Sequence, residues 1–309
     1  MRLIFLGTPE FAVPSLRKIA QSGHEILAVV TQPDKPRNRG IMTPSPVKEV
    51  ALELGLKVLQ YNRISREGVQ DIKDLAPDIM VTCAFGQILS RELLAIPKFG
   101  VINEHASLLP KYRGSSPIQW CVINGEKETG VTIMKTAYEV DSGDILFADK
   151  TEIDESETAG ELFDRLSLLA SDSIVKAIDL IESGKAVYTA QNHKEATFCK
   201  MLSKADGLID WGKSAIQIKD FVRGMNPWPC AYTMLNGETI KIYKVSVVGK
   251  QVDAESGEII QADKNGLIVA CGNGCVSIEV LQAPCAKRMS AKDFLLGKKI
   301  VVGSKFENN

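Results

Sequence analysis

The sequence predicts an α/β protein: an N-terminal Rossmann-like, mostly parallel sheet with helices on both faces, followed by a C-terminal OB-like β-barrel domain. Up to about residue 183, apolar strand-like runs alternate with helix-like stretches, which is typical of a parallel α/β sheet. Beyond residue 206, short strand-like runs are joined by tight turns, which is typical of a small barrel. With 309 residues and 45% apolar content, the chain can fill a core in each of two domains.

Hydrophobic runs and helical spacing predict the N-terminal elements. Strands are expected at 3–6, 26–31, 79–83, 101–103 and 130–135, and helices near 10–21, 46–54, 67–75 and 158–183. The first helix carries Pro14 close to its start, where proline is tolerated. The last helix is the longest, and its apolar residues recur at helical spacing, so it can cover one face of the sheet.

A polar stretch separates the two parts of the chain. We expect a catalytic domain at 1–189, a linker at 190–206 and a C-terminal domain at 207–309. Within the last domain, strands are expected at 240–248, 257–261, 267–271 and 276–281, with turns at Asn236-Gly237 and Gly272-Asn273-Gly274. This order of short strands favours an OB-type barrel.

Composition narrows the class of protein. The net charge of -1 means that a polyanionic partner has to be met by a local basic patch. No apolar run reaches membrane-spanning length, so we expect a cytoplasmic protein that does not enter a membrane. Seven cysteines without a C-x-x-C pair argue against a disulfide framework and fit a reducing cytosol. Three histidines offer little for a zinc site, and no metal is expected.

Residues with catalytic chemistry gather in one segment, 103–117 (NEHASLLPKYRGSSP). Asn103 and His105 project to the same side at the carboxyl end of a strand, where ligands bind in open α/β sheets. Asp141, which follows the next strand, can reach the same edge. Taken singly, His105 could be a structural histidine and Asp141 a turn residue. Together, an amide, an imidazole and a carboxylate can orient a carbonyl, polarise its oxygen and move a proton, as acyl transfer to an amine requires.

Glu104 lies between these two side chains. Strand alternation points it away from them, into the packing between sheet and helix. A carboxylate there has to find a partner, raise its pKa or reach solvent at the strand end, and the sequence leaves these alternatives open.

The chain resembles the superfamily of glycinamide ribonucleotide and methionyl-tRNA formyltransferases. In that superfamily N-x-H precedes S-L-L-P, R-G-x-x-P comes next, and D-x-G-D follows one strand later, as they do here. The methionyl-tRNA branch is the most similar, on further motifs at 5–11, 31–36, 44–48, 130–134, 208–211 and 226–229. Because the last two motifs belong to the C-terminal domain, they separate this branch from formyltransferases without that domain.

The resemblance implies an enzyme that transfers a formyl group from 10-formyltetrahydrofolate to the amino group of methionyl-initiator tRNA. We expect the protein to be a monomer. Asn103, His105 and Asp141 would be its catalytic residues. The folate site would be lined by Ser107, Leu108, Leu109, Pro110, Phe85 and Gly86. Contacts to tRNA would come from Arg37 and Arg39 in an inserted loop and from Lys287, Arg288 and Lys292 in the C-terminal domain.

The sequence departs from the family pattern in three places. Relatives commonly carry G-R-G in the inserted loop, whereas Asn38 precedes Arg39 here. Glu104 replaces an aliphatic residue, and 136–140 lacks the usual M-D-x-G-L.

Three rival functions remain. They are a formyltransferase for a nucleotide sugar or another small amine, a dinucleotide-dependent oxidoreductase, and a catalytically silent RNA-binding protein. The opening GTPEF is not G-x-G-x-x-G, which argues against the oxidoreductase.

Overall fold

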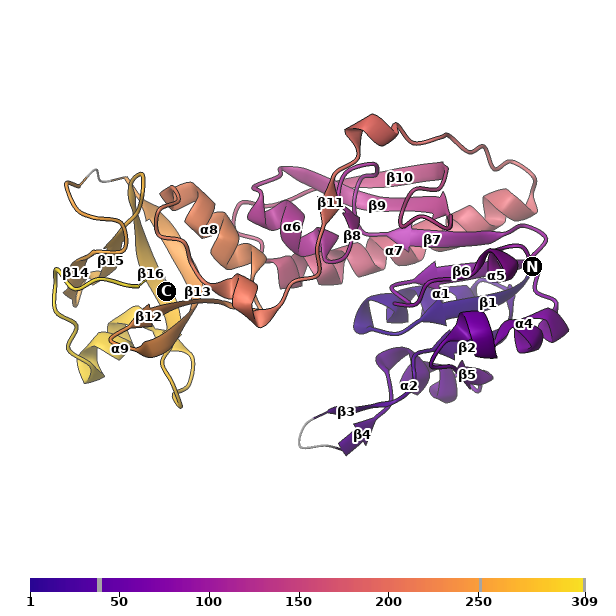
Figure 1. Ribbon diagram of the computed structural model, residues 1–309, viewed down its shortest axis with the longest axis horizontal. Helices are drawn as coiled ribbons and strands as arrows, with labels where there is room; N and C mark the ends of the chain where they lie inside the picture. The colour runs from indigo at the N-terminus through magenta and orange to yellow at the C-terminus, as the bar shows by residue number, and fades with distance from the viewer. Residues whose placement is uncertain (38–40, 250–251, 308–309) are drawn as a thin grey trace. The chain divides into compact units, whose positions relative to one another are not determined.

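A computed structural model describes residues 1–37, 41–249 and 252–307 (Figure 1). The chain divides into two compact units. Unit 1 comprises residues 1–114, 128–152 and 163–199, and unit 2 comprises residues 115–127, 153–162 and 200–309. Each unit is built around its own sheet.

Unit 1 holds a seven-stranded sheet in the order β10-β9-β7-β6-β1-β2-β5. Its strands are β1 (Arg2–Gly7), β2 (Glu25–Thr31), β5 (Val58–Gln60), β6 (Ile79–Cys83), β7 (Val101–His105), β9 (Glu128–Lys135) and β10 (Ile145–Glu152). The five strands from β5 to β7 are parallel, whereas β9 and β10 pair antiparallel at one edge. The predicted mostly parallel sheet is therefore confirmed.

Helices cover both faces of this sheet. They are α1 (Val13–Gln21), α2 (Pro46–Glu53), α3 (Ile64–Glu67), α4 (Val69–Leu75), α5 (Arg91–Leu94) and α7 (Ala159–Glu182), with a 3-10 turn η1 (Glu10–Ala12) before α1. On one face, Ile4 of β1 belongs to a buried cluster with Ile64 of α3 and Ile72 of α4. On the other face, α1 reaches β7 through a hydrogen bond between Ser15 and Glu104. Alternation along the strands thus directs one set of side chains to each helical layer.

The helix expected near 67–75 is in fact two short helices. Helix α3 begins earlier, at Ile64, and Gly68 separates it from α4. A Cβ at Gly68 would lie 2.8 Å from Cε2 of Tyr61, so the close approach of this ring requires glycine. Glycine also lowers helix propensity, which fits a break at this position.

Unit 2 is built on an antiparallel sheet in the order β12-β13-β16-β15-β14, with β17 paired to β16. The strands are β12 (Ala231–Leu235), β13 (Glu238–Val248), β14 (Ile259–Asp263), β15 (Gly266–Ala270), β16 (Cys275–Gln282) and β17 (Met289–Ser290), and the helices are α6 (Pro117–Ile123), α8 (Ala215–Gly224) and α9 (Ala291–Gly297). The end of the chain bridges both edges of the sheet: Lys305 pairs with Glu258, and Glu307 pairs with Met234. These bridges close the sheet into a barrel-like form and agree with the predicted C-terminal β domain.

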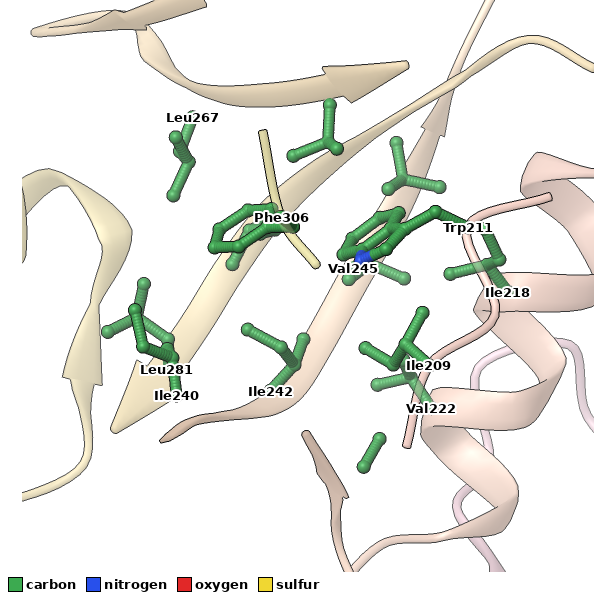
Figure 2. Close-up of a cluster of buried hydrophobic side chains, with 14 of the residues drawn as sticks. Ile209, Trp211, Ile218, Val222, Ile240, Ile242, Val245, Leu267, Leu281 and Phe306 are labelled. Carbon is green, nitrogen blue, oxygen red and sulfur yellow. The ribbon is translucent and has the colours of Figure 1, made fainter. Parts of the chain in front are cut away.

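The core of unit 2 forms around two stacked rings. Figure 2 shows Trp211 and Phe306 next to each other, with nearly parallel rings, among aliphatic side chains that include Ile209 and Ile242. The ring centroids are 5.4 Å apart and the ring planes differ by 11°. The buried indole N–H of Trp211 donates to Thr233 Oγ1 at 2.9 Å, so its polar atom is satisfied.

All seven cysteines are free thiols, six of them buried. None of the helices in residues 1–37, 41–249 and 252–307 is long and apolar enough to cross a membrane.

Candidate active site

The carboxyl end of β7 carries the two residues at the centre of the site. Asn103 and His105 project to the same side of the strand, as predicted. Asp141 lies in the turn between β9 and β10, and its Oδ2 is 3.6 Å from Nδ1 of His105. The structure therefore brings the imidazole and the carboxylate together, with the amide two residues along the same strand.

The ring of His105 is held between two acceptors. Its Nε2 lies 2.9 Å from the backbone carbonyl of Tyr112, and a carbonyl can only accept, so Nε2 carries a hydrogen. Its Nδ1 faces the Asp141 carboxylate. The ring is buried, with 7% of its surface exposed. A proton on either nitrogen therefore points at a protein oxygen, and His105 can meet a substrate through Nε2 only by giving up the Tyr112 carbonyl.

The Asn103 amide is oriented by the neighbouring strand. Thr82, on β6, donates from Oγ1 to Oδ1 of Asn103 at 2.7 Å. Within the described residues, the Nδ2 amide hydrogens make no hydrogen bond. Because the oxygen is occupied, the amide presents its two N–H donors at this edge of the sheet.

Asp141 is held by its loop and by the backbone of Gly114. Its φ of 49° lies in the left-handed region, which Asp tolerates better than most residues. The backbone N–H of Gly114 donates to Oδ2 of Asp141 at 2.8 Å. At Gly143, a Cβ would collide with the backbone of Lys135, so only glycine fits this turn. The conformation of the DSGD motif thus depends on its glycine.

A buried Arg113–Gln191 pair supports this loop, and sequence reasoning missed it. Arg113, 4% exposed, donates from Nε and Nη2 to Oε1 of Gln191 at 3.1 and 2.6 Å. The Gln191 amide donates in turn to the carbonyls of Asp141 and Gly143 at 2.9 and 2.7 Å. Gln191 lies in the segment expected to be a linker, and only its position between polar neighbours was visible in the sequence. Arg113 begins the R-G-x-x-P motif, but nothing in the sequence indicated its partner.

Two short strands anchor the segment that follows His105. Strand β8 (Arg113–Gly114) pairs in parallel with β11 (Phe198–Cys199). The backbone N–H of Tyr112, which holds His105 through its carbonyl, donates to Thr197 Oγ1 at 2.9 Å. Thr197, 85 positions away in the chain, thus helps to hold the Tyr112 peptide whose carbonyl binds His105.

The predicted folate residues fall into two segments beside β6 and β7. In the first, Ser107 is fully buried and donates to the carbonyl of Lys111 at 2.7 Å, while Leu109 is 8% exposed. Leu108 and Pro110 are half-buried, and Cδ2 of Leu108 packs over Gly130 of β9. The side chains of Ser107 and Leu109 therefore build the loop, whereas those of Leu108 and Pro110 keep part of their surface exposed.

In the second segment, Phe85 and Gly86 follow β6 directly. The Phe85 ring packs in the core, whereas its carbonyl accepts from Thr8 Oγ1 at 3.1 Å and Gln32 Nε2 at 3.0 Å. Gly86 is exposed, with φ of 78°, and a Cβ there would lie 2.5 Å from Nε2 of Gln32. A side chain at position 86 is thus excluded on both conformational and steric grounds.

The predicted RNA-contacting residues lie on a hairpin of unit 1 and on the surface of unit 2. Strands β3 (Lys35–Arg37) and β4 (Ile41–Thr43) pair antiparallel, and Arg39 falls outside the described residues. In unit 2, Lys287 and Lys292 are exposed. The exposed Arg288 guanidinium lies 3.5 Å from the centroid of the Tyr243 ring, a cation–π contact that orients it.

The buried Glu104 lies on the opposite face of β7 from His105, as predicted. It is 3% exposed, and Ser15 Oγ of α1 is 2.9 Å from each of its carboxyl oxygens. The Cys83 thiol of β6 donates a further hydrogen bond. Burial raises the pKa of Glu104 to about 7, against the lowering effect of these two donors. Of the three alternatives that the sequence left open, the carboxyl finds hydrogen-bond partners and also has a raised pKa.

One cluster in the described part of the chain has the composition of a metal site. His24, Asp179 and Glu182 place ligand atoms within 4.8 Å of one another. His24 precedes β2, at the amino ends of the parallel strands, the edge opposite to His105. Its Nε2 is 3.2 Å from Oδ1 of Asp179 and its Nδ1 is 3.2 Å from the backbone amine of Met1, so both ring nitrogens have protein partners.

Comparison with known families agrees with this arrangement. Residues 1–178 match the family model described as formyl transferase, and residues 201–299 match the formyl transferase C-terminal domain. Among solved structures, the N-formyltransferase of Helicobacter canadensis, in complex with folinic acid and dTDP-3-aminofucose, superposes with a TM-score of 0.68 at 19% identity, covering 93% of this chain and 99% of that one. The fold and both matched models define a two-domain formyl transferase.

Full-length relatives narrow the family. Methionyl-tRNA formyltransferase of Geotalea uraniireducens is 47% identical over 306 residues, 98% of this chain and 97% of that protein. The enzyme of the same name from Alkaliphilus oremlandii is 46% identical, with 98% and 99% covered. The chain belongs to the methionyl-tRNA formyltransferase family, and the predicted resemblance is confirmed.

Proposed function

We propose that the protein transfers the formyl group of 10-formyltetrahydrofolate to the amino group of methionyl-initiator tRNA in the cytoplasm. The observation that carries the proposal is the convergence of Asn103, His105 and Asp141 at one sheet edge. In the reaction the methionyl nitrogen attacks the formyl carbon, the bond from that carbon to N10 of the folate breaks, the amine loses a proton, and N10 gains one.

Asn103 supplies the donor to the developing oxyanion. Its amide oxygen is already taken by Thr82, so the N–H groups are directed to the ligand and need no reorientation during reaction. The tetrahedral intermediate places a negative charge on the former formyl oxygen, which such a donor stabilises.

His105 and Asp141 handle the proton. The Asp141 carboxylate faces Nδ1 and stabilises a protonated ring, and release of the Tyr112 carbonyl would free Nε2–H for the substrate. The loop around Asp141, pinned by Gln191, keeps this carboxylate in place while the proton moves.

A folate donor is supported by the neighbouring proteins. The Helicobacter canadensis enzyme binds folinic acid, and HypX of Aquifex aeolicus binds tetrahydrofolic acid. The half-buried Leu108 and Pro110 follow β7 and the exposed Gly86 follows β6, at the carboxyl ends of the two parallel strands, the edge that carries Asn103. We assign this border to the pterin.

The acceptor is assigned from the relatives that share the whole chain. Sequence identity is 47% to an enzyme named for methionyl-tRNA and 19% to one bound to an amino sugar nucleotide. Lys287, Arg288 and Lys292 provide exposed cations suited to phosphates, and the β3–β4 hairpin carries the loop expected at the acceptor end. No oligomeric partner is needed for this scheme, which assumes a monomer.

Formyl transfer should be assayed with 10-formyltetrahydrofolate and methionyl-tRNA, free methionine or a nucleotide-linked amino sugar. We expect transfer to methionyl-tRNA alone. Asn103→Ala should lower turnover roughly a hundredfold to a thousandfold because it removes an oxyanion donor. The exposed Asn62→Ala serves as a control and should keep wild-type turnover. Transfer to the amino sugar, or near-normal turnover of Asn103→Ala, would contradict the acceptor or the oxyanion assignment respectively.

A further inference from the structure

We propose that Glu104 is a positioning residue for formyl transfer: its protonated carboxyl holds the end of β7, and with it Asn103 and His105, against α1, and ionisation releases this hold. The inference rests on the proposed function. It concerns the face of β7 that does not meet substrate, so Glu104 acts through its neighbours.

The contact joins three elements beneath the catalytic residues. Ser15 lies in the first turn of α1 and Cys83 at the end of β6, where it is the parallel partner of Glu104. Ser15 and Glu104 are 89 positions apart. Since Asn103 and His105 flank Glu104 on the same strand, a shift of this carboxyl moves the backbone that carries both.

No positive charge balances the carboxyl. Within residues 1–37, 41–249 and 252–307, Glu104 forms no ion pair. The contact on β6 is a thiol, whose pKa is itself raised by burial and by Glu104. The remaining charged groups on the packed elements are paired elsewhere.

These other groups can be named element by element. On α1, Arg17 binds Glu53 and Lys18 binds Asp172, both at the surface. On β9, Lys135 lies over the Tyr188 ring. On β7 itself, His105 points to the opposite face, toward Asp141.

An ionised carboxylate in this place is costly, because a hydroxyl and a thiol replace only part of its hydration. The raised pKa of about 7 places the change of charge near neutral pH. Above it, the carboxylate is stabilised by reaching water, which requires α1 or the end of β7 to move. The hydrogen bonds of Asn103 and His105 are thereby coupled to the protonation of Glu104, which lies on the other face of β7.

The test is the pH profile of kcat for the full-length protein, saturated with both substrates, from about pH 6 to about pH 8.5, a range that brackets the Glu104 pKa. Glu104→Gln keeps the shape and the hydrogen-bonding capacity but has no ionisable proton. Glu152→Gln, on an exposed side chain of β10, is the matched control. If the ionised form is inactive, the ratio of kcat for Glu104→Gln to wild type should rise about tenfold between about pH 6 and about pH 8, whereas the control ratio stays constant.

Ser15→Ala provides a second readout if Glu104→Gln folds poorly. It removes a donor to the ionised carboxylate, so the alkaline fall in kcat should move to higher pH. A constant Glu104→Gln ratio, or a Ser15→Ala profile that superimposes on wild type, would overturn the inference. Absence of formyl transfer by the wild-type protein at every pH would instead count against the proposed function.

Discussion

The buried carboxyl of Glu104 also makes a prediction about stability that does not depend on catalysis. The pKa of this group is 4.5 in an unperturbed chain and about 7 in the folded protein, because burial disfavours the charge. The folded state therefore binds the proton more tightly than the unfolded state. The resulting stabilisation is fully present below about pH 4.5 and is lost as the pH rises through about 7.

The magnitude follows from the two pKa values. A difference of one pKa unit corresponds to about 1.4 kcal/mol, so the free energy of unfolding of Glu104→Gln relative to wild type should rise by about 2 to 3 kcal/mol between about pH 5 and about pH 8. Glutamine does not titrate, so this change isolates the carboxyl. Both donors, Ser15 and Cys83, remain in place in the variant.

Urea unfolding followed by far-ultraviolet circular dichroism, over a series from about pH 5 to about pH 8, measures this change. Across this range the free energy of unfolding of wild type should fall relative to that of Glu104→Gln. Glu152→Gln, on an exposed side chain of β10, should keep the pH dependence of wild type. The same pH dependence in Glu104→Gln and in wild type would refute the account of Glu104 as a buried carboxyl without a counter-charge.

Two further predictions concern the support of Asp141 and the basic surface of unit 2. Gln191→Leu should destabilise unit 1 by roughly 1 to 3 kcal/mol, because it removes two hydrogen bonds from the buried Arg113 guanidinium and leaves that group beside His193 Nδ1, at 3.2 Å; a urea midpoint near wild type would contradict this. Replacing Lys287, Arg288 and Lys292 together with glutamine should weaken tRNA binding and reduce the slope of log K against log salt by up to about 0.9 for each phosphate that the protein no longer neutralises. Binding should be measured over a salt series, with folate affinity as the internal control, and an unchanged slope would remove these residues from the tRNA-binding surface.

The fold was predictable to the extent that it depends on local patterns. Alternating apolar runs indicated the parallel strands, and the longest amphipathic stretch indicated α7, which was expected at 158–183 and spans Ala159–Glu182. The closure of the unit 2 sheet by Lys305 and Glu307 left no such local signal. Isolated bridges have no periodicity, so a pattern of alternating residues cannot reveal them.

The candidate site was also predictable only where local geometry determines the position of a residue. Asn103 and His105 could be placed on one side because strand geometry alone decides it. Asp141 was expected at the same edge because it follows the next strand, but β9 runs antiparallel to β7, with Lys135 opposite Ile102, so the loop after β9 has to fold back to bring Asp141 to His105. The partners of these residues come from distant parts of the chain: Gln191 lies 50 positions from Asp141, and Thr197 lies 85 positions from Tyr112. A glutamine in a polar stretch has the signature of a surface residue, and only the fold buries it against an arginine.

Glu104 shows why burial, and not residue type, decides what an ionisable group does. Strand alternation correctly directed it into the helix-facing layer, yet its outcome depended on what α1 and β6 present there. A lysine or arginine in that layer would have given a permanent ion pair and a lowered pKa. With a hydroxyl and a thiol instead, the carboxyl has a pKa raised to about 7, and it lies between Asn103 and His105, the residues proposed to act in formyl transfer. The same strand therefore presents an amide and an imidazole on one face, and on the other a group whose charge changes near neutral pH.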